Sequence, residues 1–340
     1  MKTLVTGAAG FIGSHVVREL LARGREVRAL VKPGEDTRNL DGLDVERVGG
    51  DVCEPESIRQ ALQGCGRLFH LAAIYAIWLK DRRAMYDVNV VGSQNVLLAA
   101  LRADLERVVY TSSIAALGVK GGGQPADEAT PFNQVGRGND YIFSKWLSQE
   151  LALSFAREDL PLTVVNPAFP FGARDRGPTP TGRIILDLIK GKMPGYFDAG
   201  LNMVDVEDVA RGHLLAEEQG KVGECYLLAN RNMTMKEFID LVGEVLAPEG
   251  IKLKKLHKIP IKVAIALGYL LEWRSDHITH KRPVISGQTL RYGNQHLYYD
   301  NAKARRELGL TFTPVEDSIR RAYHWFVENG YLRSSAASRA

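Results

Sequence analysis

A tyrosine and a lysine stand four residues apart in the run Tyr141-Ile142-Phe143-Ser144-Lys145. On a helix, this spacing places both side chains on one face. A neighbouring ammonium favours phenolate over phenol, so we expect Lys145 to lower the tyrosine pKa from its usual value of about 10. A phenol tuned in this way can exchange a proton with a substrate, which is general acid/base chemistry.

A second pair with the same spacing, Tyr299 and Lys303, shows that the spacing alone proves little. Tyr141 differs in its context, because it follows a predicted strand that ends in Thr111-Ser112-Ser113. Open α/β sheets bind ligands at the C-terminal edge of their strands. A serine hydroxyl there would orient the oxygen on which the tyrosine acts, so the first pair is the better candidate.

Glycines recur every three residues in Thr6-Gly7-Ala8-Ala9-Gly10-Phe11-Ile12-Gly13, between a predicted strand and a predicted helix. Such a turn needs glycine for its tight bend, for close approach of a pyrophosphate and for helix–sheet packing. The phosphates would lie on the amide N–H groups that begin the helix. This position after the first strand indicates a dinucleotide site. Its expected contact residues are Gly7, Ala9, Gly10, Phe11, Ile12 and Gly13.

The end of the second strand decides which nucleotide fits. An acid about 20 residues beyond the turn binds the ribose 2′-hydroxyl of NAD, but Lys32 occupies this position and Arg38 follows. Cations match a 2′-phosphate better, so NADP(H) is favoured as the cofactor. Glu35 and Asp36 nearby keep NAD(H) open.

Two further segments are expected to contact the nucleotide. Asp51 and Val52 follow a third strand, and the Asp51 carboxylate could accept a hydrogen bond from the adenine amino group. Leu71, Ala72 and Ala73 supply small residues beneath the ribose.

The elements that must position these residues alternate along the first half of the chain. Strands are predicted at 3–6, 27–31, 68–71, 107–111 and 162–166, and helices at 11–23, 55–62, 88–102 and 141–157. This order predicts right-handed βαβ crossovers. We therefore expect an α/β fold, a Rossmann doubly wound parallel sheet with a smaller, discontinuous, C-terminally weighted lobe.

The residue composition of the chain changes after Pro167. Residues 170–182 are rich in Gly, Pro and Thr and predict a loop over a cleft, while 223–228 and 296–299 are expected to return toward the sheet. The predicted nucleotide-binding domain comprises 1–169, 201–232 and 296–310. The predicted substrate-binding lobe comprises 170–200, 233–295 and 311–340.

Composition excludes several classes of protein. The net charge of +4 comes from scattered Lys and Arg without a basic run, so nucleic acid is not an expected partner. The three cysteines, Cys53, Cys65 and Cys225, show no pairing or zinc spacing, and the histidines show no ligand spacing, so no metal site is expected.

No targeting signal is predicted at the N-terminus, because Met1-Lys2 leads directly into a strand, and a cytoplasmic location is expected. The apolar segment 259–273 is too short and too polar to span a bilayer. We expect a packed helix and no stable membrane insertion, with contact at a membrane surface as the alternative.

The glycine turn, the Tyr-Ser-Lys helix and the Ser-Ser strand end together resemble the extended short-chain dehydrogenase/reductase superfamily, which includes the NAD-dependent epimerase/dehydratase family. Within it the chain is similar to the dihydroflavonol-reductase-like branch, and most of all to the hopanoid-associated sugar epimerase group. The segments that carry this likeness are 179–185, 200–210 and 328–331.

The resemblance assigns roles to single residues. It implies that Ser113, Tyr141 and Lys145 form a catalytic triad and that Lys145 also holds the nicotinamide ribose. Asn89 would support the site, Asn166-Pro167 would contact the nicotinamide, and Phe169 would line the substrate mouth.

Departures from the sugar-nucleotide pattern bear on the reaction. Leu201-Asn202-Met203 replaces the usual Arg-Asp-Phe, and a later Arg-Pro-Gly-Asp is absent. We therefore favour net hydride transfer between the nicotinamide and a small-molecule ketone or secondary alcohol, with Tyr141 as acid/base.

Alternatives to this reading stay open. One is a sugar epimerase that works by transient oxidation, and a distant one is a nucleotide sensor without catalysis. Arg174 and Arg183 are candidates for binding an anionic substrate group, and a homodimer is left open.

Overall fold

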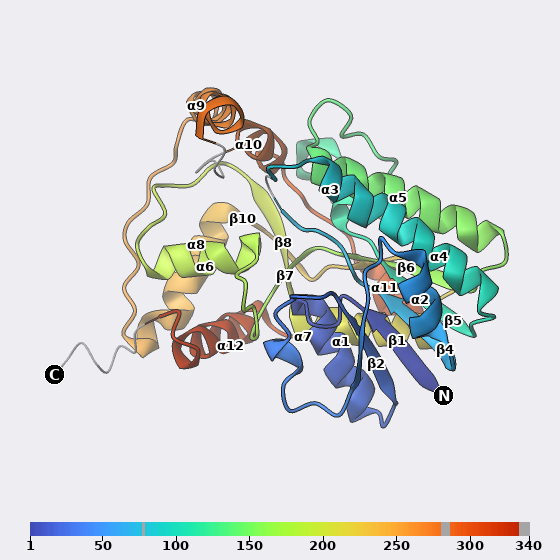
Figure 1. Ribbon diagram of the computed structural model, residues 1–340. Coiled ribbons are helices and arrows are strands. Elements are labelled where there is room, and N and C mark those ends of the chain that lie inside the picture. Colours follow the sequence, from blue (N-terminus) through green and yellow to red (C-terminus); the bar gives the residue numbers. More distant parts are fainter. Residues whose placement is uncertain (77–78, 280–285, 333–340) are drawn as a thin grey trace.

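The computed structural model describes residues 1–76, 79–279 and 286–332 (Figure 1). Its centre is a seven-stranded parallel sheet with the order β3-β2-β1-β4-β5-β6-β9. These strands are β1 (Lys2–Thr6), β2 (Val27–Val31), β3 (Glu46–Gly49), β4 (Cys65–His70), β5 (Arg107–Thr111), β6 (Leu162–Pro167) and β9 (Cys225–Leu228). The order reverses between β1 and β4, where open α/β sheets bind ligands, so the predicted Rossmann fold is confirmed.

Helices cover both faces of this sheet. One layer contains α1 (Phe11–Ala22), α7 (Val206–Gln219) and α11 (Ala302–Leu308), and the other contains α2 (Pro55–Leu62), α4 (Ser93–Arg102) and α5 (Asp140–Arg157). Because both faces are covered, the inner strands are largely buried, and every residue of β6 is buried, whereas the edge strand β3 is mostly exposed.

The helix predicted at 88–102 is interrupted in the structure. A short helix, α3 (Arg83–Tyr86), is followed by a π-helical stretch, Asp87–Gly92, and α4 then begins at Ser93. The prediction missed this break, because the apolar periodicity on which it rested does not distinguish a π turn from an α turn. Wider turns of this kind are frequent at functional sites.

A second lobe surrounds a three-stranded sheet with the order β10-β8-β7. Its strands are β7 (Phe169–Phe171), β8 (Gly200–Asp205) and β10 (Arg231–Thr234), and its helices are α6 (Pro180–Ile189), α8 (Met235–Leu246) and α12 (Val315–Glu328). These helices bury a separate apolar cluster that includes Phe238 and Phe326. Helices α9 (Ile261–Arg274) and α10 (Gly287–Gly293) lie together at the top of the molecule (Figure 1).

Two expectations for the second half need correction. Residues 170–182, predicted as a loop, include the end of β7 and the first turn of α6, which begins at Pro180 after the N-cap Thr179. Residues 223–228 return to the large sheet as β9, but 296–299 do not join it. Instead His296 forms an isolated bridge to Gly200, and Tyr299 forms one to Ala126. These two residues thus pair with distant segments of the chain outside the large sheet.

The division into domains remains a proposal. Strand β8 pairs within the small sheet, whereas α7, which follows it directly, packs on α1 beside the large sheet. In the structure the small sheet thus extends to Asp205, whereas the boundary proposed from the sequence lies between residues 200 and 201. The parts of the proposed lobe at 280–285 and 333–340 lie outside the described residues.

No helix within the described ranges is long and apolar enough to cross a membrane.

Candidate active site

The turn between β1 and α1 is built so that only glycine fits. Gly7 has a φ of +67°, and a Cβ there would stand 2.7 Å from the backbone N of Ala72. A Cβ on Gly13 would stand 2.0 Å from the Gly7 carbonyl oxygen. Gly10 is the N-cap of α1, and no side chain caps the amides of the first turn. These amides form a cradle suited to the phosphates of a dinucleotide.

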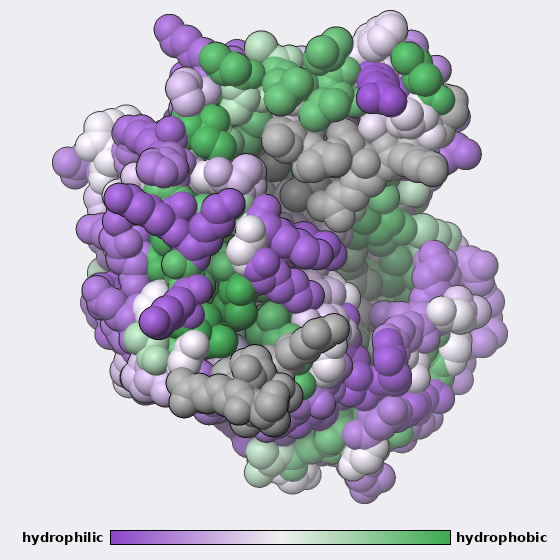
Figure 2. Space-filling model, turned by 90° about the vertical axis from the view of Figure 1, so that its left-hand side faces the viewer, coloured by the Kyte–Doolittle hydropathy of each residue, from purple (hydrophilic) through white to green (hydrophobic). Residues whose placement is uncertain are grey.

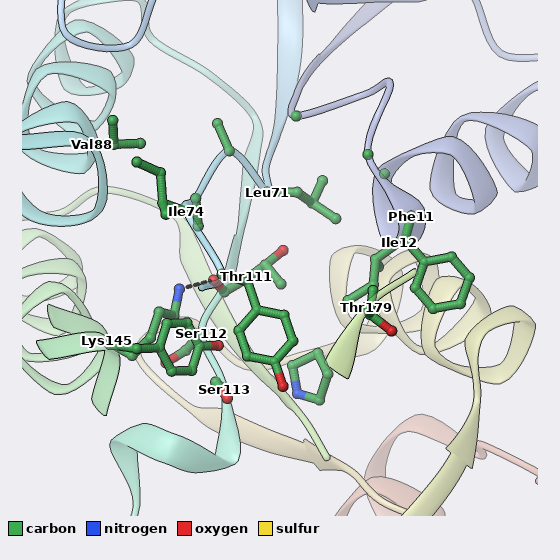
Figure 3. A pocket seen from close by; sticks show the side chains of 18 of the residues that line it. Phe11, Ile12, Leu71, Ile74, Val88, Thr111, Ser112, Ser113, Lys145 and Thr179 are labelled. Carbon is green, nitrogen blue, oxygen red and sulfur yellow. Dashed lines mark hydrogen bonds between the residues drawn. The ribbon is translucent and has the colours of Figure 1, made fainter. Parts of the chain in front are cut away.

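A cavity of about 640 Å³ begins at this turn and continues past the ends of β1, β4, β5 and β6. Figure 3 shows side chains from distant parts of the chain around it, with Phe11 and Ile12 on one side and Ser113 and Lys145 on another. Most of the predicted site residues line this cavity. They are Gly7, Gly10, Phe11, Ile12, Gly13, Lys32, Asp51, Val52, Leu71, Ala72, Ala73, Ser113, Tyr141, Lys145, Pro167 and Phe169.

The predicted triad residues meet at the floor of the cavity. Ser113 follows β5 and caps a short 3₁₀ turn by accepting a hydrogen bond from the Ala115 amide at 3.1 Å. The Lys145 ammonium, from α5, donates to the Thr111 carbonyl oxygen at 2.8 Å and lies 5.3 Å from the centre of the Tyr110 ring. Asn139 caps the N-terminus of α5, which fixes the first turn that carries Tyr141.

The acidity of Tyr141 differs from the expectation. Burial raises its pKa to about 12, and a hydrogen bond with Ser113 offsets only part of this effect. The predicted lowering of this pKa is therefore wrong for this geometry, in which burial dominates. The Lys145 ammonium donates to the Thr111 carbonyl. A phenol with this pKa keeps its proton at neutral pH.

Asn89 lies outside the cavity lining and supports it. From the π-helical stretch, its amide oxygen accepts from the Ile74 N–H at 2.7 Å, and its amide nitrogen donates to the Ile74 carbonyl and the Ser144 hydroxyl. Asn89 thereby ties the segment after β4 to α5. Ala9, predicted to bind the cofactor, is also buried away from the lining.

The two predicted cations at the far end of the cavity have different surroundings. The Lys32 ammonium lies on the cavity rim and pairs with Asp51 at 2.8 Å. Arg38 is held by Asp36 at 2.6 Å and does not line the cavity. Glu35 also reaches the rim, and burial raises its pKa.

Arg174 and Arg183, the candidates for binding an anion, are not among the described residues that line the cavity. Arg183 lies close enough to Asp175 to lower the pKa of its carboxyl, although burial dominates and raises this pKa to about 6. Asp175 in turn accepts hydrogen bonds from the Thr179 amide and hydroxyl at the start of α6.

Several lining residues were missed by the sequence analysis. Tyr75 places its ring 4.8 Å from that of Tyr141, and Tyr292 reaches the cavity from α10. No local motif marks either tyrosine. Thr179, by contrast, belongs to the segment 170–182 that the sequence predicts over a cleft; it lines the cavity and caps the start of α6.

Residues 3–229 match the family model described as the NAD dependent epimerase/dehydratase family. The chain belongs to this family of extended short-chain dehydrogenases/reductases. The predicted recognition is thereby confirmed at the family level, and the chain is an NAD(P)-dependent enzyme, an oxidoreductase or an epimerase.

Relatives in this family match over almost their whole length. A Synechocystis protein provisionally named dihydroflavonol 4-reductase is 38% identical over 97% of this chain and 96% of its own. Sterol demethylase protein B of Methylococcus capsulatus is 36% identical over 98% of this chain and 100% of its own. The likeness to the hopanoid-associated group stays an expectation.

Two solved structures share the fold over nearly their full length. The protein gox2253 is 39% identical, covers 97% of this chain and 99% of its own, and has a TM-score of 0.86. PA4631 of Pseudomonas aeruginosa, a nucleoside-diphosphate-sugar epimerase, is 27% identical over 98% of this chain and 99% of its own, with a TM-score of 0.80.

Proposed function

We propose that this family member is an NADP(H)-dependent carbonyl reductase whose substrate is an apolar or mixed ketone. One observation carries the proposal. Among the described residues that line the cavity, the only cations are Lys32 and Lys145. Both lie at positions expected for the cofactor, and the remaining substrate space is bordered by Ile74, Tyr75, Phe169, Pro170 and Tyr292. A sugar diphosphate would need cationic partners there.

The names of relatives support this substrate class. One relative is named for a sterol. A Stigmatella aurantiaca relative, 31% identical over 95% of this chain and 96% of its own, is named a ketoreductase of a farnesylated dihydroquinoline oxide. Both names describe large, mainly apolar molecules.

The proposed mechanism divides the reaction between cofactor and protein. A dinucleotide held on the glycine turn at Gly7, Gly10 and Gly13 would supply the hydride that reduces the carbonyl carbon. The hydroxyls of Ser113 and Tyr141 hydrogen-bond the carbonyl oxygen, and Tyr141 gives its proton to that oxygen as negative charge develops. The tyrosine pKa of about 12 suits this direction, because the phenol stays protonated at neutral pH. Lys145, which lines the cavity and donates to the Thr111 carbonyl, is proposed to hold the nicotinamide ribose.

The decisive test follows NADPH oxidation against product formed with aromatic ketones, β-keto acids and lipid-derived ketones. We expect stoichiometric oxidation by the wild type. Tyr141→Phe should bind nucleotide normally and lose about a hundredfold or more in kcat. Stoichiometric reduction by Tyr141→Phe at the wild-type rate would refute the proposed role of the phenol.

For the cofactor, we propose that Lys32 selects NADP(H). A charge-assisted contact to phosphate contributes roughly 1.5 to 3 kcal/mol, but the ammonium is shared with Asp51. We therefore expect about a tenfold preference for NADPH over NADH. Lys32→Asp should abolish it, with Arg38→Asp as the matched control that changes it less. An unchanged preference in Lys32→Asp would contradict the assignment.

An epimerase is the second candidate, because PA4631, an epimerase, matches nearly the whole chain. An epimerase keeps its nucleotide while the keto intermediate turns over, and firm anchoring of the substrate helps it to do so. Tightly copurifying nucleotide together with interconversion of sugar epimers, without net oxidation, would favour this candidate over the reductase.

We further propose that the enzyme acts in the cytoplasm, where reducing conditions suit its free cysteines Cys53, Cys65 and Cys225.

A further inference from the structure

Helix α9 exposes its large apolar side chains. Val263, Leu267, Leu270 and Trp273 are 67%, 46%, 60% and 54% exposed. Their spacing of three to four residues places them along one face of the helix. Ile278, just after the helix, is also exposed. Figure 2 shows hydrophobic atoms gathered at this upper end of the molecule.

The opposite face of α9 is made of small residues that pack closely. Ala264 and Gly268 are buried, and a Cβ on Gly268 would stand 2.6 Å from the backbone N of Gly287 in α10. Helix α9 thus fits tightly on α10 through its small residues. An amphipathic helix on the surface of a soluble protein normally turns its large apolar residues toward the core. In α9 they face outward, so the exposed stripe indicates an interaction surface.

The charged side chains that α9 exposes have one sign. They are Lys262 and Arg274, at the two ends of the helix, whereas Glu272 is half-buried. The acids of this region are engaged, since Glu272 accepts a hydrogen bond from Ser286 and Asp276 pairs with Arg82 at 3.2 Å. The surface therefore combines exposed apolar side chains with exposed cations.

We propose that the α9 stripe docks on the surface of an anionic lipid bilayer, with α9 lying in the interface. Apolar residues would enter the headgroup and acyl boundary while Lys and Arg contact lipid phosphates, and Trp273 suits the interface through its amphipathic ring. The helix has 14 residues, and its length of about 21 Å is too short to cross the hydrocarbon layer.

Charge disfavours a second copy of the chain as the occupant. A two-fold axis pairs a surface with itself. Two α9 stripes would then bring Lys262 and Arg274 of one copy against the same cations of the other. Anionic lipids offer the complementary charge. The inference concerns this surface alone and does not depend on the reaction proposed above.

Sedimentation with vesicles tests the docking surface. The full chain should bind vesicles of phosphatidylglycerol mixed equally with phosphatidylcholine more tightly than pure phosphatidylcholine, and salt should weaken this binding. Leu270→Glu should lower the affinity about tenfold or more, and Lys262→Glu about fivefold. Val222→Glu, at an exposed apolar residue outside α9, is the matched control and should bind as the wild type does.

Tryptophan fluorescence gives a second readout. Vesicles should shift the wild-type emission to shorter wavelength, and Trp273→Phe should lose this shift while its melting temperature and nucleotide binding stay unchanged. No binding to either vesicle, or equal binding by Leu270→Glu and the wild type, would overturn the proposal. A dimer in solution that Leu270→Glu dissociates would overturn it in favour of a second copy.

Discussion

Burial raises the proton affinity of the Tyr141 phenol. The two directions of the proposed reaction should therefore depend differently on pH. Alcohol oxidation needs the phenolate as a base, and a raised pKa of about 12 keeps its population small at neutral pH. We expect the oxidation rate to rise about tenfold per pH unit through the neutral and mildly alkaline range. Ketone reduction uses the protonated phenol and should stay nearly flat there.

Initial rates in both directions, with saturating nucleotide, check this prediction. The pH stability of the enzyme over the same range serves as the control. An oxidation rate that levels off below about pH 8 would mean that the working pKa is near neutral, as the spacing of Tyr141 and Lys145 first suggested.

Two lysines on related sequence patterns allow a matched comparison. Lys145 is buried and donates to Thr111 at the floor of the cavity, whereas Lys303 donates to Glu224 and to the Cys225 carbonyl away from it. Lys145→Met keeps the bulk of the stem and should lower kcat/KM about a hundredfold or more and weaken nucleotide binding. Lys303→Met should leave both nearly unchanged, and equal losses in the two variants would show that the wrong pair was chosen.

At the scale of elements, the junction of β1 and α1 depends on contact between backbones. The Cβ of Gly13→Ala would collide with the Gly7 carbonyl, so α1 would have to move away from the sheet. We expect at least about a tenfold loss in nucleotide affinity, because the amide cradle moves with the helix. Gly177→Ala, where a Cβ meets open space, should bind nucleotide normally. Calorimetric titration of both variants with nucleotide measures these affinities. Normal affinity in Gly13→Ala would contradict the proposed phosphate-binding role of the glycine turn.

The helices, strands and turns that could be predicted are those marked by a pattern within a short stretch of sequence. The strands and helices of the first half follow from apolar periodicity, and the glycine turn follows from the backbone that it requires. The small sheet could not be predicted, since β7, β8 and β10 are short and pair across long stretches of sequence. For the same reason the sequence revealed Tyr141 and Lys145 but not Tyr292, whose place in the cavity depends on how α10 packs.

At the scale of the whole molecule, three buried histidines make stability sensitive to acid. Burial is the main cause that lowers the pKa of His15 to about 4, of His70 to about 3 and of His213 to about 4. These histidines therefore bind protons in the unfolded chain at pH values where they stay neutral in the folded chain. Stability is lost as pH falls below about 6.5. Asp175, with a raised pKa of about 6, acts in the opposite direction.

Urea unfolding at several pH values measures this effect. We expect the free energy of unfolding to fall by at most about 4 kcal/mol per pH unit between about pH 6 and pH 5. His213→Gln should make the slope shallower, and His257→Gln, at an exposed position, should leave it unchanged. A stability that is constant or rises over this interval would contradict the assignment of neutral buried histidines.

The bridge between Ala126 and Tyr299 joins the segment after Ser113, the proposed catalytic serine, to a part of the chain that is synthesised late. The Tyr299 hydroxyl also donates to the Ile114 carbonyl, one residue beyond Ser113. On the ribosome, the glycine turn and the strands around it emerge long before these contacts can form. A nascent chain stopped after β9 should thus leave Tyr141 open to chymotrypsin, whereas the complete chain should protect it. Equal protection in both would show that the proposed active site assembles without these C-terminal contacts.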